Sequence, residues 1–396
     1  MQNLALPHVL FIPSWYPTSH NDLRGIFFQQ EISALHEVGV HVGVIYPDLR
    51  RWRELNAGAL KANHFQCTYE VERGIPTFRI HAWNPLGRRL RVWLWTRLAS
   101  KLAQKYIAEF GKPDLIHAYS TLWAGIAAER ISQAHHLPYI LSEHSSSFAR
   151  HIMATWERTM VKSSLRNASC ITAVSSSLIK YLKPYVGNRP IHIIPNMVDT
   201  EFFTPPQSSN TRGFRFVSIA MLNANKGIDV LLRAFAMAFK GKNAVTLEIG
   251  GTGAELQPLK QLTRDLGIAP QVTFLGALNR EQVRETLWHA NAFVLPSYVE
   301  TFGIAIIEAM ATGLPVIVTR CGGPEDFVTP EVGFLVPPGD VKTLAETLST
   351  MVIRQSQFAH RAFKIRALIK QRFGKDVIVK QLLESYSTIL GQGKLL

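Results

Sequence analysis

The sequence predicts two α/β domains, each built on a doubly wound parallel sheet with helices on both faces. Its 396 residues exceed one ordinary core and suit two domains of about 150–200 residues. Short apolar runs alternate with longer helical patterns along the whole chain, which is typical of parallel α/β architecture. These runs are mostly continuous and rich in β-branched residues, as expected for strands that are covered on both faces.

The expected strands fall into two groups. The first group comprises His8–Ile12, His41–Tyr46, Thr77–His81, Leu115–Ala118, Tyr139–Ser142, Cys170–Val174 and His192–Ile194. The second comprises Arg215–Ala220, Val245–Ile249, Val272–Leu275, Ala292–Leu295, Pro315–Val318 and Gly333–Val336. Because ligands of doubly wound sheets bind outside the carboxyl ends of the strands, we expect functional residues in the loops that follow them.

The best linker signal lies between these groups. Thr200–Gly213 carries paired prolines, Pro205 and Pro206, followed by small polar residues. We therefore expect an N-terminal domain over residues 1–198 and a C-terminal domain over residues 199–375. The last segment, residues 376–396, has helical periodicity up to Leu390 and is expected to pack back on the N-terminal domain.

Composition limits the class of protein and its partners. The chain is 47% hydrophobic and 18% charged, as in folded globular proteins, and its formal charge of +14 favours an anionic partner. Three widely spaced cysteines without metal-ligand spacing indicate reduced, partly buried thiols. The first residues lack a basic signal-peptide region, and no uncharged apolar run reaches the roughly 20 residues that span a bilayer. We expect a cytoplasmic protein.

The densest group of functional signals lies in Leu295–Val318, LPSYVETFGIAIIEAMATGLPVIV. A strand pattern ends there, a loop carries Glu300, and a helical pattern begins near Gly303. At a helix N-terminus the unpaired amides coincide with the positive end of the helix dipole. We therefore expect the backbone of Thr301, Phe302 and Gly303 to offer a phosphate site.

A second carboxylate, Glu308, follows Glu300 with seven residues between them. A loop carboxylate and a helix carboxylate can accept hydrogen bonds from hydroxyls at opposite ends of a bound nucleotide sugar. A capping carboxylate and an ordinary helix-face glutamate would give the same local pattern. The segment alone leaves both interpretations open.

The spacing of Glu300 and Glu308 resembles the E-x7-E motif of retaining glycosyltransferases with the GT-B fold, specifically glycosyltransferase family 4. The resemblance covers nearly the whole chain and rests on further motifs in the family's order. They are Ile191–Asp199 (IHIIPNMVD), Asn225–Ala234 (NKGIDVLLRA), Ile249–Leu256 (IGGTGAEL), Val272–Gly276 (VTFLG), Cys321–Glu325 and Gly333–Asp340 (GFLVPPGD). One such match is a weak signal, whereas the ordered set is specific.

The resemblance implies roles for the donor-side residues. Glu300 would contact the transferred sugar near the reaction centre, and Glu308 would hold the ribose hydroxyls. Lys226 would neutralise the donor diphosphate, and backbone groups from Val272 to Phe274 would cradle the base. A lysine beside the diphosphate is chemically reasonable, because the leaving group gains negative charge as the glycosidic bond breaks.

One position departs from the family pattern. The family usually has an arginine five residues before the motif lysine, whereas this sequence has Met221 five residues before Lys226. One positive charge on the diphosphate is therefore missing or comes from elsewhere. Arg320, at the end of an expected strand, is a candidate substitute. Met197 in place of the glycine of I-P-N-G-V-D is a milder change.

Acceptor-side candidates follow strands of the first domain. Ile12–Gly25 (IPSWYPTSHNDLRG) stands where the family has a glycine-rich donor-facing loop, and Gly25 alone remains of its glycine pair. A plain turn before a helix is the other interpretation. His117 in DLIHAYS and His144 in LSEHSSSF each end a strand. Histidine can exchange a proton with an attacking hydroxyl, although strand-end histidines are also often structural.

A basic segment, Pro85–Phe110, has no acidic residue before Glu109. Its cations are Arg88, Arg89, Arg91, Arg97, Lys101 and Lys105. Trp93 and Trp95 beside arginines suit a membrane interface, whereas a helix packed on its own sheet with a solvated basic face would give the same pattern. We hypothesise that this segment makes a peripheral contact with the inner face of an anionic membrane.

The expected function is transfer of a hexose-type sugar from a nucleotide diphosphate sugar to a glycan or lipid-linked acceptor, in envelope or exopolysaccharide biosynthesis. Resemblance implies retention of configuration, no cofactor and no metal, with His144, Glu300 and Lys226 as catalytic residues. His117 and His144 would lie on the acceptor side. Nucleic acid is not an expected partner, because no nucleic-acid-binding module is recognised.

The sequence bears on three other classes of protein. A nicotinamide dehydrogenase needs G-x-G-x-x-G after the first strand, where this chain has Pro13-Ser14-Trp15-Tyr16-Pro17. A noncatalytic nucleotide-sugar-binding protein would bind donors without turnover. A nucleotide-sugar epimerase of the same fold would isomerise its donor without an acceptor. The last two stay open as alternatives.

Overall fold

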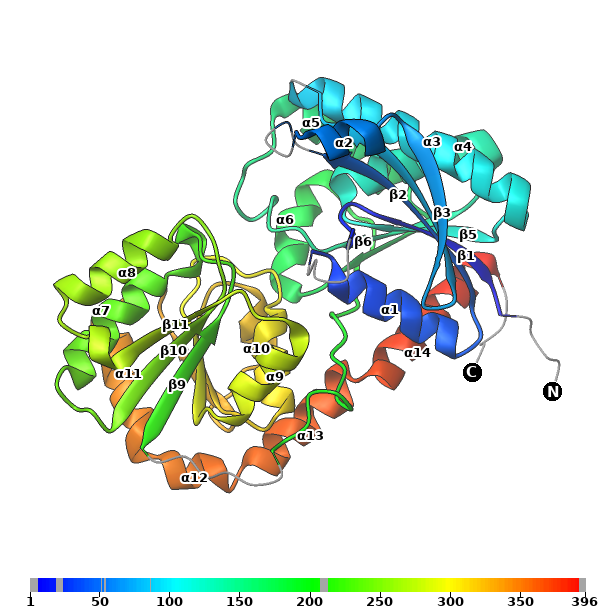
Figure 1. Ribbon diagram of the computed structural model, residues 1–396. Coiled ribbons are helices and arrows are strands. Elements are labelled where there is room, and N and C mark those ends of the chain that lie inside the picture. The colour runs from blue at the N-terminus through cyan, green and yellow to red at the C-terminus, as the bar shows by residue number, and fades with distance from the viewer. Residues whose placement is uncertain are drawn as a thin grey trace. The chain divides into compact units, whose positions relative to one another are not determined.

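The chain forms two compact units, each with its own parallel sheet (Figure 1). The structure, a computed structural model, describes residues 6–18, 24–50, 52, 55–85, 87–206 and 213–391. The first unit contains Met1–Val174, Ile179–Pro195 and Ile378–Leu396, and the second contains Ser175–Leu178 and Asn196–Val377. The part of the predicted linker from 207 to 212 lies outside the described residues.

The first unit contains an eight-stranded sheet in the order β3–β4–β2–β1–β5–β6–β7–β8. Its strands are β1 His8–Pro13, β2 His41–Arg50, β3 Gln66–Glu72, β4 Ile75–Trp83, β5 Leu115–Tyr119, β6 Tyr139–Glu143, β7 Cys170–Ala173 and β8 His192–Ile193. Neighbouring strands are parallel except β3, which runs antiparallel to β4.

Helices cover both faces of this sheet, with α3 and α4 on one face and α1 and α14 on the other (Figure 1). Their bounds are α1 Ile26–Glu37, α2 Ala57–Ala62, α3 Arg88–Phe110, α4 Ile126–His135, α5 Thr155–Asn167, α6 Ser176–Val186 and α14 Lys375–Leu390. Within the described part of the chain, no helix is both long enough and apolar enough to cross a bilayer.

The second unit contains a six-stranded sheet in the order β11–β10–β9–β12–β13–β14, and every pairing is parallel. Its strands are β9 Phe214–Ile219, β10 Val245–Gly250, β11 Val272–Gly276, β12 Ala292–Leu295, β13 Val316–Thr319 and β14 Gly333–Val336. Its helices are α7 Ile228–Phe239, α8 Leu256–Asp265, α9 Arg280–Trp288, α10 Ile304–Ala311, α11 Val341–Ile353, α12 Gln355–Ala359 and α13 Ala362–Phe373.

Each sheet reverses its strand order at one place. In the first unit the chain moves outward from β1 through β2 and then returns to β5 on the other side. In the second unit it moves from β9 through β10 to β11 and then returns to β12. The loops that leave the two central strands separate at such a reversal, which leaves a crevice at their carboxyl ends where ligands of doubly wound folds bind.

The predicted doubly wound fold is confirmed, and every strand expected from the sequence is present with ends shifted by a few residues at most. The sequence does not predict β3, which has the polar sequence QCTYEVE and is largely exposed. As the antiparallel edge strand of its sheet it buries little on either face, so it lacks the continuous apolar run that marks the other strands.

A buried carboxyl group lies in the core of the first unit. The Tyr119 hydroxyl on β5 donates a hydrogen bond of 2.5 Å to Oε1 of Glu31 on α1. Glu31 is only 5% exposed. Burial raises the pKa of Glu31 to about 7, although the hydrogen bond from Tyr119 opposes that rise. The folded protein therefore favours a protonated Glu31 below neutral pH.

Glu31→Gln should stabilise the first unit, and more strongly at alkaline than at acidic pH. A carboxyl whose pKa is about 7 when folded and 4.5 when unfolded opposes folding as the pH rises between those values. Glutamine keeps the acceptor for Tyr119 without the charge. We expect the free energy of unfolding to rise by about 3 kcal/mol at pH 8 and about 1 kcal/mol at pH 5. Denaturant unfolding at the two pH values measures this, and an equal change at both would contradict the assignment.

Candidate functional site

An ion pair spans the strand reversal of the second unit. Lys226 lies in the loop after β9 and Glu300 in the loop after β12, and these strands are the central pair of the sheet. The Lys226 ammonium lies 2.5 Å from Oε1 of Glu300, and the Ser297 hydroxyl donates to the same oxygen at 2.8 Å. Two residues predicted from separate motifs therefore meet at the crevice.

Backbone hydrogen bonds fix the loop that carries Glu300. The Glu300 amide donates to the carbonyl of Cys321 at 3.1 Å, and its carbonyl accepts from the amide of Gly323 at 2.8 Å. The Asn225 side chain donates to the carbonyl of Val299 at 2.8 Å, next to Lys226. The loops after β9, β12 and β13 are thus one connected structure, and Glu300 sits at its centre.

Glycines allow these loops to approach backbone to backbone. A Cβ on Gly227 would lie 2.3 Å from the carbonyl oxygen of Pro296, and Gly227 has φ of +62°. Gly251 and Gly253, after β10, approach the carbonyls of the β9 loop equally closely. Only glycine tolerates such contacts at positive φ, so the motif glycines are required by geometry. The loops at this strand reversal therefore contact one another through their backbones.

Helix α10 begins where the sequence indicated. Gly303 is its N-cap with φ of +97°, and Ile304 is its first residue. The Phe302 side chain is 2% exposed and packs against the rings of Phe327 and Phe373, at centroid distances of 5.4 and 5.3 Å. Phe302 can therefore offer a ligand only its backbone. Thr301 precedes it in the same loop.

The second carboxylate of the motif, Glu308, lies on α10 and is half-buried. Burial raises the pKa of Glu308 to about 7, and the nearby positive charge of Arg280 on α9 partly opposes that rise. Glu300 and Glu308 thus occupy different environments. Glu300 is paired with Lys226, whereas burial brings the pKa of Glu308 close to neutral pH.

The residues expected to cradle the base lie on β11, at the edge of the sheet. Val272 is buried, and the half-buried ring of Phe274 lies 5.9 Å from the Lys260 ammonium. Strand β11 pairs with β10 alone among the described strands. The cradle itself stays a prediction.

Met221 is 67% exposed in the loop after β9, and Arg320 is exposed directly after β13. The two positions therefore follow the carboxyl ends of different strands. Replacement of the missing arginine charge by Arg320 also stays a prediction.

The first unit has a similar arrangement at its own reversal, between β1 and β5. The Ser14 hydroxyl, after β1, donates to the carbonyl of Leu122 at 2.7 Å and accepts from the amide of Ala124. In the same turn Trp123 has φ of +81° and ψ of −78°, a strained conformation for a bulky residue. Strain of this kind persists only where surrounding contacts enforce it.

Gly25 is required in its turn. It is the N-cap of α1 with φ of +72°, and a Cβ there would lie 2.4 Å from the carbonyl oxygen of Trp15. Residues 19–23 of the same loop lie outside the described residues. The contact of Gly25 with a donor is untested.

His144 follows β6 and is 9% exposed. Its ring lies 4.8 Å from Phe28 and 5.6 Å from Tyr119 by centroid distance. The preceding residue, Glu143, is fully buried and accepts hydrogen bonds from the amides of His144 and Thr121 and from the Thr121 hydroxyl. Glu143 thereby joins the loop after β6 to the strained turn after β5.

His117 lies in the core of the first unit, and its expected place on the acceptor side stays a prediction. It is fully buried on β5, its Nδ1 is 2.7 Å from the Tyr386 hydroxyl of α14, and its Nε2 is 2.7 Å from the Ser142 hydroxyl. Burial and the neighbouring His144 hold the pKa of His117 well below its usual range. In this arrangement both ring nitrogens are engaged, so we assign His117 to holding α14 against the sheet.

Helix α3 carries the basic segment in two different environments. Trp95, Leu98 and Leu102 are buried against the sheet, so the expectation of Trp95 at a membrane interface is wrong. The Arg88 guanidinium lies 2.5 Å from the fully buried Glu157 carboxylate, and Arg91 is half-buried.

The outer face of α3 is exposed and basic. It carries Arg89, Arg97, Lys101 and Lys105 together with Trp93, which is 49% exposed. The Arg97 guanidinium lies over the Trp93 ring, 5.4 Å from its centroid.

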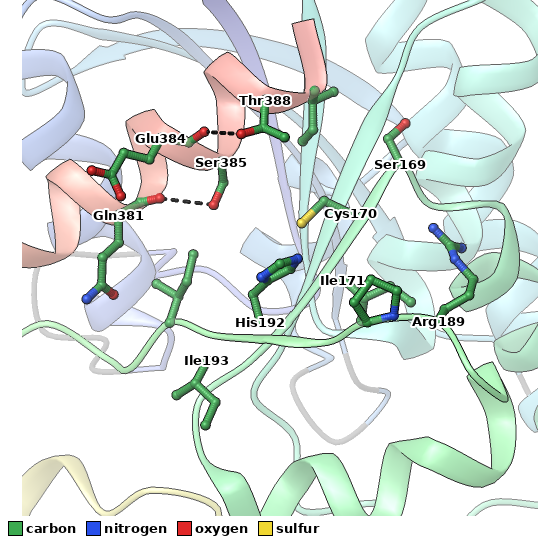
Figure 2. A pocket seen from close by; sticks show the side chains of 13 residues that line it. Ser169, Cys170, Ile171, Arg189, His192, Ile193, Gln381, Glu384, Ser385 and Thr388 are labelled. Atoms are coloured by element: carbon green, nitrogen blue, oxygen red, sulfur yellow. Dashed lines mark hydrogen bonds between the residues drawn. The ribbon is translucent and has the colours of Figure 1, made fainter. Parts of the chain in front are cut away.

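A cavity of about 530 Å³ lies in the first unit, between the amino ends of β7 and β8 and helix α14 (Figure 2). Cys170 and His192 line it on the strand side, and Gln381, Ser385 and Thr388 on the helix side. The Ser385 and Thr388 hydroxyls donate to carbonyls of their own helix. None of the predicted site residues lines this cavity, and it lies at the end of the sheet opposite to the one where doubly wound folds bind ligands.

Sequence reasoning missed several residues of these sites. Glu143 and Ser14 orient loops through hydrogen bonds to partners distant in sequence, and Ser297 donates to Glu300 three residues away. The charge of Arg280, on another helix, lowers the pKa of Glu308. The one available signal was position, because Ser14, Glu143 and Ser297 each stand within two residues of a strand end. In the described ranges no group of three His, Cys, Asp or Glu side chains could hold a metal ion.

Family models match both halves of the chain. The model for glycosyltransferase family 4 matches residues 26–202, and that for glycosyl transferases group 1 matches residues 199–365. A putative teichuronic acid biosynthesis glycosyltransferase of Bacillus subtilis, TuaC, is 27% identical over 96% of this chain and 98% of its own. N-acetyl-alpha-D-glucosaminyl L-malate synthase of Bacillus anthracis is 25% identical over 75% of this chain and 80% of its own.

Solved structures show the same fold. Sucrose-phosphate synthase from Thermosynechococcus elongatus superimposes with a TM-score of 0.82 at 22% identity, covering 97% of this chain and 99% of its own. HepE from Anabaena, solved in complex with UDP, superimposes with a TM-score of 0.73 at 20% identity, covering 96% of this chain and 100% of its own. With family models matching from residue 26 to residue 365 and relatives aligned over most of its length, the chain belongs to the family 4 type of glycosyltransferases with the GT-B fold.

Proposed function

We propose that this glycosyltransferase uses a nucleoside diphosphate sugar as its donor and transfers the sugar with retention of anomeric configuration. The observation that carries the proposal is the Lys226–Glu300 ion pair at the strand reversal of the second unit. It puts a cation and a carboxylate side by side, in loops whose backbones approach one another closely. A diphosphate needs the cation, and sugar hydroxyls need the carboxylate as an acceptor.

The proposed chemistry follows from those groups. The bond between the sugar C1 and the diphosphate oxygen breaks, and the acceptor oxygen bonds to C1 on the same face. The departing phosphate oxygen takes the acceptor's proton, so no covalent enzyme nucleophile is needed. Lys226 stabilises the negative charge that accumulates on the diphosphate, and the outward amides at the start of α10 support it. Glu300 orients the sugar, Glu308 holds the ribose, and His144 positions the acceptor hydroxyl.

Two substrate classes are proposed from the relatives. HepE was solved with UDP and with UDP-glucose, and TuaC is named for teichuronic acid biosynthesis. We propose a hexose-type sugar as the transferred group and a glycan or lipid-linked acceptor in envelope or exopolysaccharide biosynthesis. The proposed reaction needs neither a cofactor nor a metal.

Donor binding tests the proposal directly. Thermal unfolding is followed with UDP-, GDP- and ADP-sugars and with the free nucleotides. A ligand at 100 times its dissociation constant stabilises by about 2.7 kcal/mol, which is a shift of a few degrees. Glu308→Ala should lose the shift, and Glu346→Ala, an exposed glutamate on α11, should keep it. The absence of a shift with any nucleotide would contradict the proposal. A shift without turnover on any acceptor would favour a noncatalytic binding protein. Isomerisation of the donor without an acceptor would favour an epimerase.

Met221→Arg should tighten nucleoside diphosphate binding. The substitution restores a cation at an exposed position in the loop that also carries Lys226. A charge-assisted hydrogen bond to phosphate contributes about 1.5–3 kcal/mol, so the dissociation constant should fall about tenfold or more. Titration calorimetry measures it, with Met237→Arg on α7 as the exposed control. Equal effects of both substitutions would show that only net charge matters.

We also propose that the exposed basic face of α3 contacts an anionic membrane. This contact would locate the protein at the inner face of that membrane. The face consists of Arg89, Arg97, Lys101 and Lys105 with the exposed Trp93. Cations attract anionic headgroups, and a tryptophan ring inserts at the level of the headgroups.

Replacing Arg97, Lys101 and Lys105 by glutamate should weaken binding to vesicles containing anionic phospholipid. Each cation near such a surface contributes about 1 kcal/mol, so the loss should be about a hundredfold. Cosedimentation at low salt measures binding. The control replaces Lys240, Lys242 and Lys364 of the second unit by glutamate, which changes the net charge equally. Wild-type protein that does not bind anionic vesicles at low salt would end the proposal.

A further inference from the structure

A second pocket of the first unit lies between α3, α4 and α5, where α4 packs against both of the other helices. Its volume is about 240 Å³. Residues that line it are Arg89, Trp93 and Thr96 of α3, Arg130 of α4, and Trp156 and Met160 of α5. Arg89 and Trp93 also belong to the exposed basic face of α3, so the pocket lies beside the surface that we propose contacts a membrane.

The two arginines of this pocket have no compensating carboxylate. Both are exposed, and neither Arg89 nor Arg130 forms an ion pair within the described ranges. Acidic residues close by in the sequence are engaged elsewhere, because Glu157 pairs with Arg88 and Glu129 accepts hydrogen bonds from two polar side chains of α5. Two cations that line one pocket repel each other unless an anion joins them. The pair therefore favours an anionic group at the rim.

Besides its arginines, the pocket is lined mainly by apolar and aromatic side chains. The Arg89 guanidinium lies over the ring of Trp156, 5.5 Å from its centroid. Met160 adds a flexible thioether side chain, which adapts to the shape of an apolar ligand. Cations beside aromatic and apolar walls suit a molecule in which an anionic group adjoins an apolar one.

One polar side chain of the pocket lining lacks a partner. Thr96 is 5% exposed, and its hydroxyl makes no hydrogen bond to any residue that the structure describes. A helical serine or threonine can donate to the carbonyl four residues before it, as Ser100 does to that of Thr96 at 3.0 Å. A buried hydroxyl without a partner costs stability, so an acceptor on a ligand would gain from completing it.

The size of the pocket limits what fits. Sites that enclose a complete small molecule measure about 300–1,000 Å³. At about 240 Å³, this pocket suits one part of a larger molecule whose remainder stays outside. A phospholipid has an anionic phosphate, adjoining glycerol esters that accept hydrogen bonds, and chains that stay in the bilayer. A free phosphate ion would leave the apolar walls uncovered.

We propose that the pocket between α3, α4 and α5 binds one anionic phospholipid. The lipid phosphate lies between Arg89 and Arg130. An ester carbonyl accepts a hydrogen bond from the Thr96 hydroxyl, and the glycerol carbons contact Trp93 and Trp156. The inference deepens the proposed membrane contact, on which it rests, because it adds one specific lipid site to a general attraction between charges.

A soluble lipid tests this site apart from the membrane surface. Titration calorimetry of the full chain measures the binding of dihexanoyl phosphatidylglycerol, at concentrations below those at which it forms micelles. Glycerol 3-phosphate carries the phosphate without acyl chains. It should bind at least about tenfold more weakly, because it buries less apolar surface.

Two arginine variants separate a contact in the pocket from a change of net charge. Arg130→Gln should weaken binding of the lipid about tenfold, because a charge-assisted hydrogen bond to phosphate is lost. Arg158 is an exposed arginine of α5 that does not line the pocket. Arg158→Gln removes the same charge and should change the dissociation constant less than about twofold, because solvent screens an exposed charge.

Thr96 provides a test in which affinity and stability move differently. Thr96→Val should weaken binding about fivefold, since the hydrogen bond to the lipid is lost. It should leave the unfolding temperature unchanged or higher, because it removes a buried hydroxyl that has no partner in the described part of the chain. Thr96→Ser keeps the hydroxyl and should bind the lipid as wild-type protein does.

The outcomes are distinct. Equal effects of Arg130→Gln and Arg158→Gln, unchanged affinity in Thr96→Val, or glycerol 3-phosphate that binds as tightly as the lipid would each overturn the lipid site. Wild-type protein that binds anionic vesicles but no soluble lipid would also overturn it, and would leave the membrane contact intact. Protein that binds neither vesicles nor soluble lipid would overturn the membrane contact as well.

Discussion

The loop that carries Glu300 depends on a close approach that only glycine permits. Gly227 and Gly323 bring the loops after β9 and β13 against the loop after β12, and hydrogen bonds from the Gly323 amide and the Asn225 side chain hold that contact. The approach leaves Lys226 within 2.5 Å of Glu300. The cation is thus already compensated, so in the proposed complex a diphosphate competes with Glu300 for Lys226. On that proposal, binding of the diphosphate and orientation of the sugar by Glu300 are coupled.

The two units use the same topological device with different chemistry. At the reversal of the second unit the loops carry the Lys226–Glu300 ion pair, whose cation suits a charged donor. At the reversal of the first unit, Ser14 and Glu143 hold a strained turn through hydrogen bonds, close to His144 and its aromatic neighbours. These two residues fix the shape of the backbone and add no positive charge. Such a surface suits a neutral acceptor hydroxyl, which must be positioned accurately but needs little charge compensation.

Much of this arrangement could be predicted from the sequence, because the strands are covered on both faces and the motif residues follow their ends. Lys226 and Glu300 were placed by motifs alone, and the structure brings them into contact. Strand β3 could not be predicted, since its polar pattern is that of an exposed edge. The burial of His117 and Trp95 could not be predicted, because a histidine at a strand end and a tryptophan on an amphipathic helix give the same local pattern whether buried or exposed. Arg280 was missed because its effect on Glu308 is purely tertiary.

The central claim is that the crevice between β9 and β12 receives the donor's nucleotide, and a crystal structure with a bound nucleoside diphosphate tests it most directly. The account predicts that the ribose hydroxyls lie within hydrogen-bond distance of the Glu308 carboxylate and that the phosphates lie beside Lys226 and the start of α10. A nucleotide bound elsewhere, for example in the cavity between β8 and α14, would contradict it. So would a nucleotide in the crevice whose ribose faces away from Glu308.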